Sequence, residues 1–228
     1  MGMIRLFLFG SLMISLACSN NDGKVRKLRT VEADTIDRPV RESFDLQVKK
    51  YEDPKRQNWQ DPKFVIEALG DLQDKTIADI GSGTGYFTFQ LAVPAKKVIA
   101  IDIEQRFLNY IEDRKTEMYD KNLAAKIETR LTQPDDPLLN DAEVDLILIV
   151  NTISFIDSRE SYLKKLRNGL TNEGRLVIVD YERGDIPVGP ADELKVDQSQ
   201  VVRDLKVAGF YVESVDTSSL QYQYLIKA

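Results

Sequence analysis

Three glycines at alternate positions, Gly81, Gly83 and Gly85, follow an acid, Asp79, in the stretch Thr-Ile-Ala-Asp-Ile-Gly-Ser-Gly-Thr-Gly of residues 76–85. The apolar run before the glycines is typical of a buried strand, and the residues after them continue at helical spacing. Glycine accepts positive φ and has no Cβ, so the backbone of such a turn can approach a ligand closely. This strand, turn and helix predict a site for a nucleotide-like ligand at the carboxyl edge of an α/β sheet.

Tyr86 helps to separate two kinds of ligand. A dinucleotide turn needs glycine or alanine at that position, because the helix must pack closely on the strand. The bulk of a tyrosine argues against a nicotinamide-dependent reductase. In the pattern Asp-x-Gly-x-Gly-x-Gly, the acid can instead face a ligand amine, and no diphosphate has to be housed.

A second acid, Asp102, ends the apolar run of residues 97–102. A carboxylate about 20 residues beyond a glycine turn can bind both hydroxyls of a ribose. The same acid could cap the helix predicted over residues 104–116, and a nicotinamide site would use it as well. Asp102 therefore supports a nucleotide-like ligand without choosing between the cofactors.

These residues together resemble motif I and the following strand of the class I S-adenosylmethionine-dependent methyltransferases. The resemblance implies that S-adenosylmethionine is the cofactor, that the glycine turn wraps its methionine and ribose parts, and that Asp102 binds the ribose. Residues 51–62, 186–190 and 208–210 are similar to a subgroup of bacterial secreted or lipoprotein-type methyltransferases. The cofactor-binding residues implied are Asp79, Gly81, Ser82, Gly83, Gly85, Asp102, Ile103, Gln133, Asn151 and Arg56.

The remaining apolar runs predict further strands at residues 124–131, 144–150, 175–180, 210–215 and 222–226. Helices are expected between them, among them residues 160–170, closed by Asn172–Gly174, and residues 198–208, ending at Gly209. Alternating strands and helices predict an α/β fold with a doubly wound, seven-stranded, mostly parallel sheet, one antiparallel edge strand and helices on both faces.

The residues that would carry the chemistry are less defined. Asp180, Tyr181 and Glu182, at the end of the fifth strand, are the candidate base or substrate contacts. Arg56 could meet the cofactor carboxylate, while Tyr51 and Trp59 could cover its sulfonium by cation–π attraction.

The chain contains no histidine, although the resembling subgroup often has histidines where this chain has residues 151–156. No metal site is predicted. Two functions remain open: methyl transfer to an unidentified small or membrane-associated substrate, or non-catalytic binding of S-adenosylmethionine or S-adenosylhomocysteine by a lipoprotein.

The N-terminus predicts export and anchoring. Residues 1–17 read as a signal peptide whose apolar run is too short to span a bilayer, and Cys18, the only cysteine, follows as in a lipobox. Residues 18–42 would be a polar tether and residues 43–228 the methyltransferase domain. This predicts a membrane-anchored lipoprotein of the bacterial cell envelope.

The sequence does not determine on which side of the membrane the domain lies, because four basic residues soon after the apolar run favour a cytoplasmic location for the segment that follows it. S-adenosylmethionine is also made in the cytosol. The net charge of −6 argues against nucleic acid as a partner.

Overall fold

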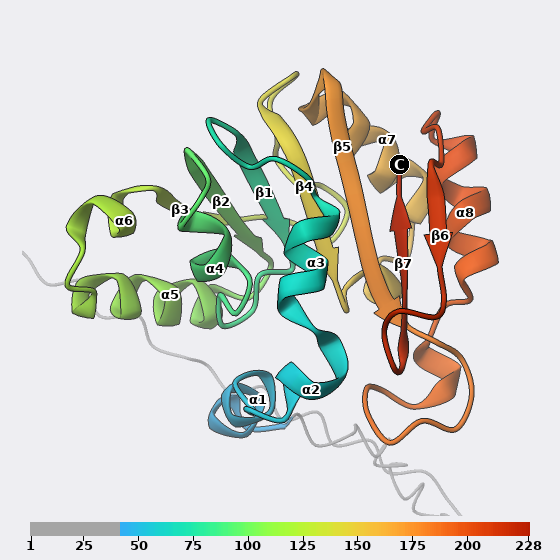
Figure 1. The fold of residues 1–228 in the computed structure, drawn as a ribbon, viewed down its shortest axis with the longest axis horizontal. Helices are drawn as coiled ribbons and strands as arrows, with labels where there is room; N and C mark the ends of the chain where they lie inside the picture. Colours follow the sequence, from blue (N-terminus) through green and yellow to red (C-terminus); the bar gives the residue numbers. More distant parts are fainter. Residues whose placement is uncertain (1–41) are drawn as a thin grey trace, which may run out of the picture. The chain divides into compact units, whose positions relative to one another are not determined.

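A seven-stranded sheet runs through residues 42–228, the part of the chain that the computed structural model describes (Figure 1). Its strand order is β3-β2-β1-β4-β5-β7-β6. Among these strands, β7 alone is antiparallel to both of its neighbours, and the short β6 lies outside it. The predicted doubly wound, mostly parallel sheet is confirmed. The strands are β1 (Thr76–Ile80), β2 (Lys97–Asp102), β3 (Ile127–Leu131), β4 (Val144–Val150), β5 (Leu170–Tyr181), β6 (Ser214–Asp216) and β7 (Gln223–Lys227).

Two helical layers bury the two faces of the sheet. Side chains alternate along each strand, so Ile77 of β1 packs with α3, α4 and α5, whereas Ala78 and Ile80 pack with α7 and α8. The four central strands are buried on both faces, which explains their nearly continuous apolar sequence. The helices are α1 (Phe44–Tyr51), α2 (Arg56–Gln60), α3 (Pro62–Ala68), α4 (Thr88–Ala92), α5 (Gln105–Glu117), α6 (Lys121–Ala125), α7 (Arg159–Gly169) and α8 (Gln198–Val207), with short 3₁₀ turns η1 (Ile153–Phe155) and η2 (Asp192–Leu194).

Helix α8 shows how local signals set the boundaries. Asp197 caps its first turn by accepting a hydrogen bond from the backbone N–H of Ser199. At the other end Gly209 has a φ of 90°, and the N–H groups of Gly209 and Phe210 donate to the carbonyls of Lys206 and Leu205. This is the hydrogen-bond pattern of a Schellman cap, and the predicted glycine end is confirmed.

Three predicted boundaries differ from the structure. Residues 124 and 125 end α6 rather than begin a strand, because Asp120 caps a short helix there. The predicted turn at residues 172–174 lies within β5, as a bulge between the pairs Val144–Leu170 and Leu146–Arg175. The strand expected from residue 210 begins only at residue 214, since α8 needs residues 209 and 210 for its cap.

The predicted signal peptide (residues 1–17), the lipidated Cys18 and the tether up to residue 41 lie outside the described residues and stay predictions. From residue 42 onward, no helix combines the length and the apolar character that a membrane span requires.

A buried ion pair joins the two helices on one face of the sheet. Nε of Arg159, on α7, donates to Oδ2 of Asp204, on α8, at 2.7 Å. Asp204 is only 4% exposed, and its other oxygen accepts from the side chain of Gln200. A buried carboxylate that loses its cationic partner costs several kcal/mol.

We therefore expect Arg159→Ala to lower the free energy of unfolding by about 3 kcal/mol, because Asp204 is left charged and buried. The matched control is Arg203→Ala, which removes an exposed arginine from α8, the helix that carries Asp204, and should cost less than about 0.5 kcal/mol. Urea denaturation of both variants provides the measurement. Equal losses in the two variants would contradict a stabilising role for the buried pair.

Candidate functional site

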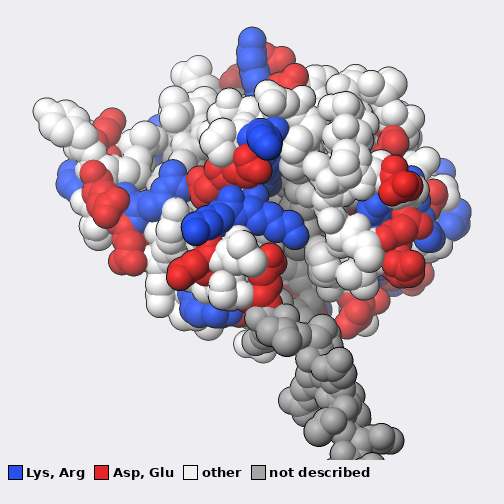
Figure 2. Space-filling view, turned by 90° about the horizontal axis from the view of Figure 1, so that it is seen from below, with Lys and Arg blue, Asp and Glu red and all other residues white. Residues whose placement is uncertain are grey.

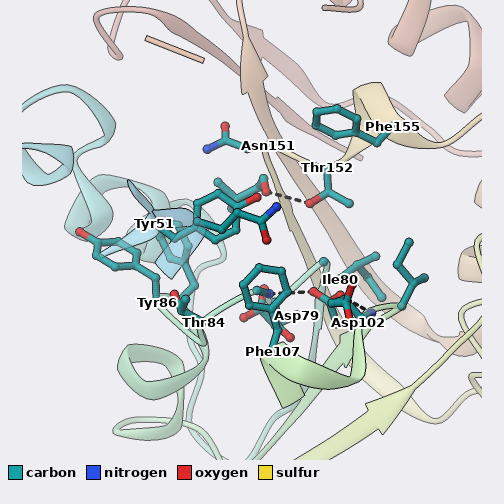
Figure 3. Close-up of a pocket in the computed structure, with 18 of the residues that line it drawn as sticks. Tyr51, Asp79, Ile80, Thr84, Tyr86, Asp102, Phe107, Asn151, Thr152 and Phe155 are labelled. Atoms are coloured by element: carbon teal, nitrogen blue, oxygen red, sulfur yellow. Dashed lines mark hydrogen bonds between the residues drawn. The ribbon is translucent and has the colours of Figure 1, made fainter. Parts of the chain in front are cut away.

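A cavity of about 580 Å³ lies at the carboxyl edge of the sheet, where β3, β2, β1, β4 and β5 end side by side. Helices α1 and α2 lie below these strand ends, and both contribute lining residues (Figure 1). Side chains from the separate segments surround one space in the close-up view (Figure 3). Open α/β sheets bind ligands at this edge, so the fold itself singles out this cavity.

The glycine turn, residues 81–85, borders the cavity. Its three glycines are required for different physical reasons. Gly81 and Gly83 line the cavity with φ of 71° and 52°. A Cβ on Gly81 would come within 2.2 Å of the Thr152 side chain, and one on Gly83 would lie 3.4 Å from the ring of Tyr51. Gly85 is not a lining residue: a Cβ there would clash with Phe89 at 2.8 Å. Its glycine therefore serves the packing of the following helix.

Asp102 holds this turn in place. Its Oδ2 accepts a hydrogen bond from the N–H of Gly83 at 2.8 Å, and its Oδ1 accepts from the N–H of Glu104 at 2.9 Å. The N-cap residue of α5 is Glu104, so Asp102 orders the entry to the helix without being its cap. An ionised carboxylate has about four acceptor sites, so Asp102 can still accept from a ligand hydroxyl.

Asp79 points into the cavity from the end of β1 and is only 3% exposed. The hydroxyl of Thr88, in the first turn of α4, donates to its Oδ2 at 2.6 Å. Burial raises the pKa of Asp79 to about 6, although the Thr88 hydrogen bond and the charge of Arg56 act in the opposite direction. A buried carboxylate held in this way is suited to a cationic ligand group.

Arg56, at the start of α2, also lines the cavity. Its guanidinium lies 4.2 Å from the ring centre of Tyr86, and it donates to the side chain of Gln60 and to the carbonyl of Tyr51. Burial lowers the pKa of Arg56, and the neighbouring acids and tyrosines oppose that change. Among the described residues, no carboxylate lies within ion-pair distance of this guanidinium, so it can take an anionic ligand group.

Four buried polar atoms of the lining have no hydrogen-bond partner among residues 42–228: the hydroxyls of Ser82, Thr84, Tyr86 and Thr132. Buried polar groups are nearly always paired, and an orphaned group indicates a missing ligand or water. Thr132 and Gln133 follow β3, at the far end from β5. The predicted cofactor, which carries hydroxyls, a carboxylate, an ammonium and ring nitrogens, fits this set of donors and acceptors.

Of the other predicted cofactor residues, Ile103 and Asn151 also line the cavity. Ile103 follows Asp102, and its apolar side chain is 59% exposed. Asn151 follows β4 with a φ of 56°, and its Oδ1 accepts from the side chain of Gln223. A non-glycine residue in this conformation carries strain, which is typical of a residue at a functional site.

The structure separates the three catalytic candidates. Tyr181 lines the cavity, and burial raises the pKa of its hydroxyl to about 12. Asp180 is not a lining residue, because its carboxylate accepts from Ser154 and from the N–H of Tyr181. Glu182 is likewise absent from the lining, and its backbone pairs with Tyr222. Tyr181 is therefore the candidate that can touch a ligand.

Several lining residues escaped the sequence reasoning. Thr84 sits between two glycines, and Thr132 directly follows a strand, so their positions alone could have identified them. Phe155 and residues 187–189 reach the cavity only because separate loops converge there. No spacing in the sequence reports such a convergence.

Charges of both signs surround this edge of the sheet. In the view from below, a short band of Lys and Arg side chains crosses the centre of the coloured part, with Asp and Glu side chains above and below it (Figure 2). At the cavity itself, Arg106 is paired with Glu104 at 3.0 Å. The mouth of the cavity therefore has no single sign of charge.

Comparison with known proteins agrees with this site. A family model described as "Methyltransferase domain" matches residues 71–224. "Ribosomal RNA small subunit methyltransferase A" of Koribacter versatilis is 28% identical over 129 residues, which cover 53% of this chain and 45% of that protein. "Ubiquinone/menaquinone biosynthesis C-methyltransferase UbiE" of Cellvibrio japonicus is 25% identical over 171 residues, 73% of this chain and 64% of that protein. The chain thus spans less than half the length of the first relative and less than two thirds of the second.

Solved structures share the fold. A methyltransferase dependent on S-adenosylmethionine from Aquifex aeolicus superimposes with a TM-score of 0.74 at 24% identity, covering 82% of this chain and 98% of that one. A second one, from Mesorhizobium loti, gives a TM-score of 0.60 at 14% identity, covering 75% and 96%. Because the family model spans more than half of the chain, the protein belongs to the methyltransferase-domain family, as a class I member whose cofactor is S-adenosylmethionine.

Proposed function

We propose that this protein transfers a methyl group from S-adenosylmethionine to a small or membrane-associated acceptor. The observation that carries the proposal is the cavity lining: two buried acids and four orphaned hydroxyls lie along one sheet edge. Bound there, the cofactor supplies a methyl group already activated on a sulfonium. The protein then has to align the acceptor and exclude water.

Each end of the cofactor has a matching group in the chain. We assign Asp79 to the ammonium, Arg56 to the carboxylate and Asp102 to the ribose hydroxyls. The backbone of Gly81, Ser82 and Gly83 would border the methionine and ribose parts. Ile103, Thr132 and Gln133 would border the base, where the hydroxyl of Thr132 and the amide of Gln133 could bond its ring nitrogens.

The curated relatives raise a different acceptor class, because the names of several include ribosomal RNA. Polyanion binding depends on clustered cations. The cavity mouth mixes both signs, and Arg106 is held by Glu104. This supports a small acceptor over nucleic acid. Non-catalytic binding of the same cofactor is the second candidate, because the chain has no histidine to act as a base.

Binding of S-adenosylhomocysteine tests the site directly. We expect Gly83→Val to weaken it more than about tenfold, or about 1.4 kcal/mol, because a branched side chain would obstruct the turn and resist positive φ. Gly184→Val is the matched control, since Gly184 also has positive φ but nothing within 4 Å of its Cβ position. Calorimetry measures both, and circular dichroism checks folding.

Equal affinity for S-adenosylhomocysteine in folded Gly83→Val and in wild-type protein would contradict the assignment of the cofactor site to this cavity. Turnover is then followed with radiolabelled S-adenosylmethionine and a bacterial extract separated into lipid, small-molecule and RNA fractions. Label in the lipid or small-molecule fraction is the expected result. Label in RNA overturns the acceptor class, and no label with intact binding favours the non-catalytic candidate.

The pKa of Asp79 predicts a pH-dependent affinity. Its carboxylate attracts an ammonium only when ionised, and it ionises above about pH 6. Affinity for S-adenosylhomocysteine should therefore be constant near pH 7.5 and fall by up to about tenfold per unit below pH 6. Methylthioadenosine, which lacks the amino-acid part, should not show this fall. The same fall with methylthioadenosine, or with Asp79→Asn, would contradict the assignment of Asp79.

We further propose that the protein is anchored to the cell envelope through Cys18, with residues 1–17 removed as a signal peptide. The proposal is supported by the apolar run and the lone cysteine that follows it. Metabolic labelling with a palmitate analogue should label the wild type and the control Ser19→Ala but not Cys18→Ser. Absence of label in the wild type would refute the anchor.

A further inference from the structure

The cavity is longer than its polar part. It extends from the end of β3 to the end of β5, across β2, β1 and β4. Neighbouring strands lie about 4.8 Å apart, so Asp102 on β2 and Tyr181 on β5 are separated by about 14 Å along this edge. The two acids and all four orphaned hydroxyls belong to β1, β2, β3 and the turns after them. The end at β4 and β5 is therefore available for a second molecule.

The lining at this second end is mostly aromatic and apolar. The rings of Trp59 and Tyr181 lie 5.9 Å apart with an angle of 36° between their planes. Gly189 packs directly on Tyr181: a Cβ there would lie 2.8 Å from the ring. Pro187 and Val188 line the cavity beside it. Together these residues form a wall of ring faces and hydrocarbon.

The charged side chains near this wall are bonded elsewhere. Asp180 faces Ser154, as described above. Asp192 accepts from the N–H of Gly184 at 2.6 Å and pairs with Arg183 at 2.8 Å. The ammonium of Lys195, a residue only 6% exposed, donates to the carbonyl of Gly184 at 2.8 Å. These bonds close the base of the loop and leave its tip, residues 187–189, on the cavity.

We propose that the β4–β5 end of the cavity is the subsite for the methyl acceptor, and that it takes an uncharged, planar ring. This inference rests on the proposed function, which places the cofactor at the other end. A flat ring can lie against the faces of Trp59 and Tyr181, and stacked or tilted aromatic pairs contribute beyond simple burial. The polar groups that remain, the hydroxyl of Tyr181 and the amide of Asn151, can orient a neutral substituent.

A charged acceptor is disfavoured for a physical reason. Burying an ion without a partner costs far more than burying a neutral ring. The positive charge of Arg56 opposes the rise in the pKa of the Tyr181 hydroxyl. This guanidinium, however, is stacked on Tyr86 and is assigned to the cofactor carboxylate. A saturated molecule of the same size would lose the flat contact with the two rings.

Three probes that share a fused pair of six-membered carbon rings test the subsite in protein saturated with S-adenosylhomocysteine. They are 2-naphthol, which is planar and neutral, 2-naphthoate, which is planar and anionic, and decahydro-2-naphthol, which is neutral and not planar. We expect calorimetry to show at least tenfold tighter binding of 2-naphthol than of either other probe. Equal or tighter binding of 2-naphthoate or decahydro-2-naphthol would overturn the proposed acceptor class.

Variants locate the binding. Gly189→Val should weaken 2-naphthol at least tenfold, because the new side chain displaces the Tyr181 ring. Gly70→Val, at a glycine with nearly the same φ (85° against 86°) that does not line the cavity, should not. Trp59→Ala should have the same effect as Gly189→Val, and Trp59→Phe should restore most of the affinity. Affinity for S-adenosylhomocysteine should change less than twofold in Gly189→Val and in the control.

The possible failures can be told apart. If the wild type does not bind S-adenosylhomocysteine, the proposed function is wrong, and the acceptor subsite that depends on it is wrong as well. If it binds S-adenosylhomocysteine but Gly189→Val and Trp59→Ala bind 2-naphthol as the wild type does, only the subsite is wrong.

Discussion

The carboxylate of Asp102 connects the parts on which the site depends. It ends β2, yet it bonds the N–H of Gly83 in the turn after β1 and the N–H of Glu104 at the start of α5. One buried acid thus fixes the relative position of two strand ends and a helix. Hydrogen bonds from backbone N–H groups to a charged acceptor are among the stronger ones in proteins. The same side chain keeps acceptor capacity for a ligand, so structural and binding roles are combined in one group.

The site also carries a cost in stability. Burial raises the pKa of both Asp79 and Asp180 to about 6, above the ordinary value of an aspartate. Between about pH 4 and 6 the folded protein therefore binds more protons at these groups than the unfolded chain, and their contribution to stability falls as the pH rises. At neutral pH each acid costs roughly 2–3 kcal/mol of folding free energy. For Asp79 a cationic ligand group would recover part of that cost, whereas Asp180 holds Ser154 and the turn after β4.

The fold and the acceptor chemistry are separate questions in this family. The names of the relatives given above refer to ribosomal RNA and to ubiquinone/menaquinone biosynthesis, and the solved neighbours share the sheet at low identity. One fold can support many acceptors because binding residues lie on turns and loops that a constant scaffold holds in place. In this chain, residues 187–189 lie in the loop after β5, and Trp59 lies on the short helix α2.

The sequence by itself determined the sheet and most of the strand-end residues that line the cavity. Asp79, the glycines and Asp102 lie at strand ends, and the ends of parallel strands must meet at one edge, so short-range spacing was sufficient. Arg56, Gln133, Ile103 and Asn151 also reach the cavity as predicted. Boundaries that depend on pairing, such as the bulge in β5, could not be predicted, because a residue's partner lies far away in the chain. Only the tertiary structure decided that Asp180 turns away, that Gly85 serves packing, and that Trp59 meets Tyr181, since side-chain direction and loop convergence leave no periodic signal in the sequence.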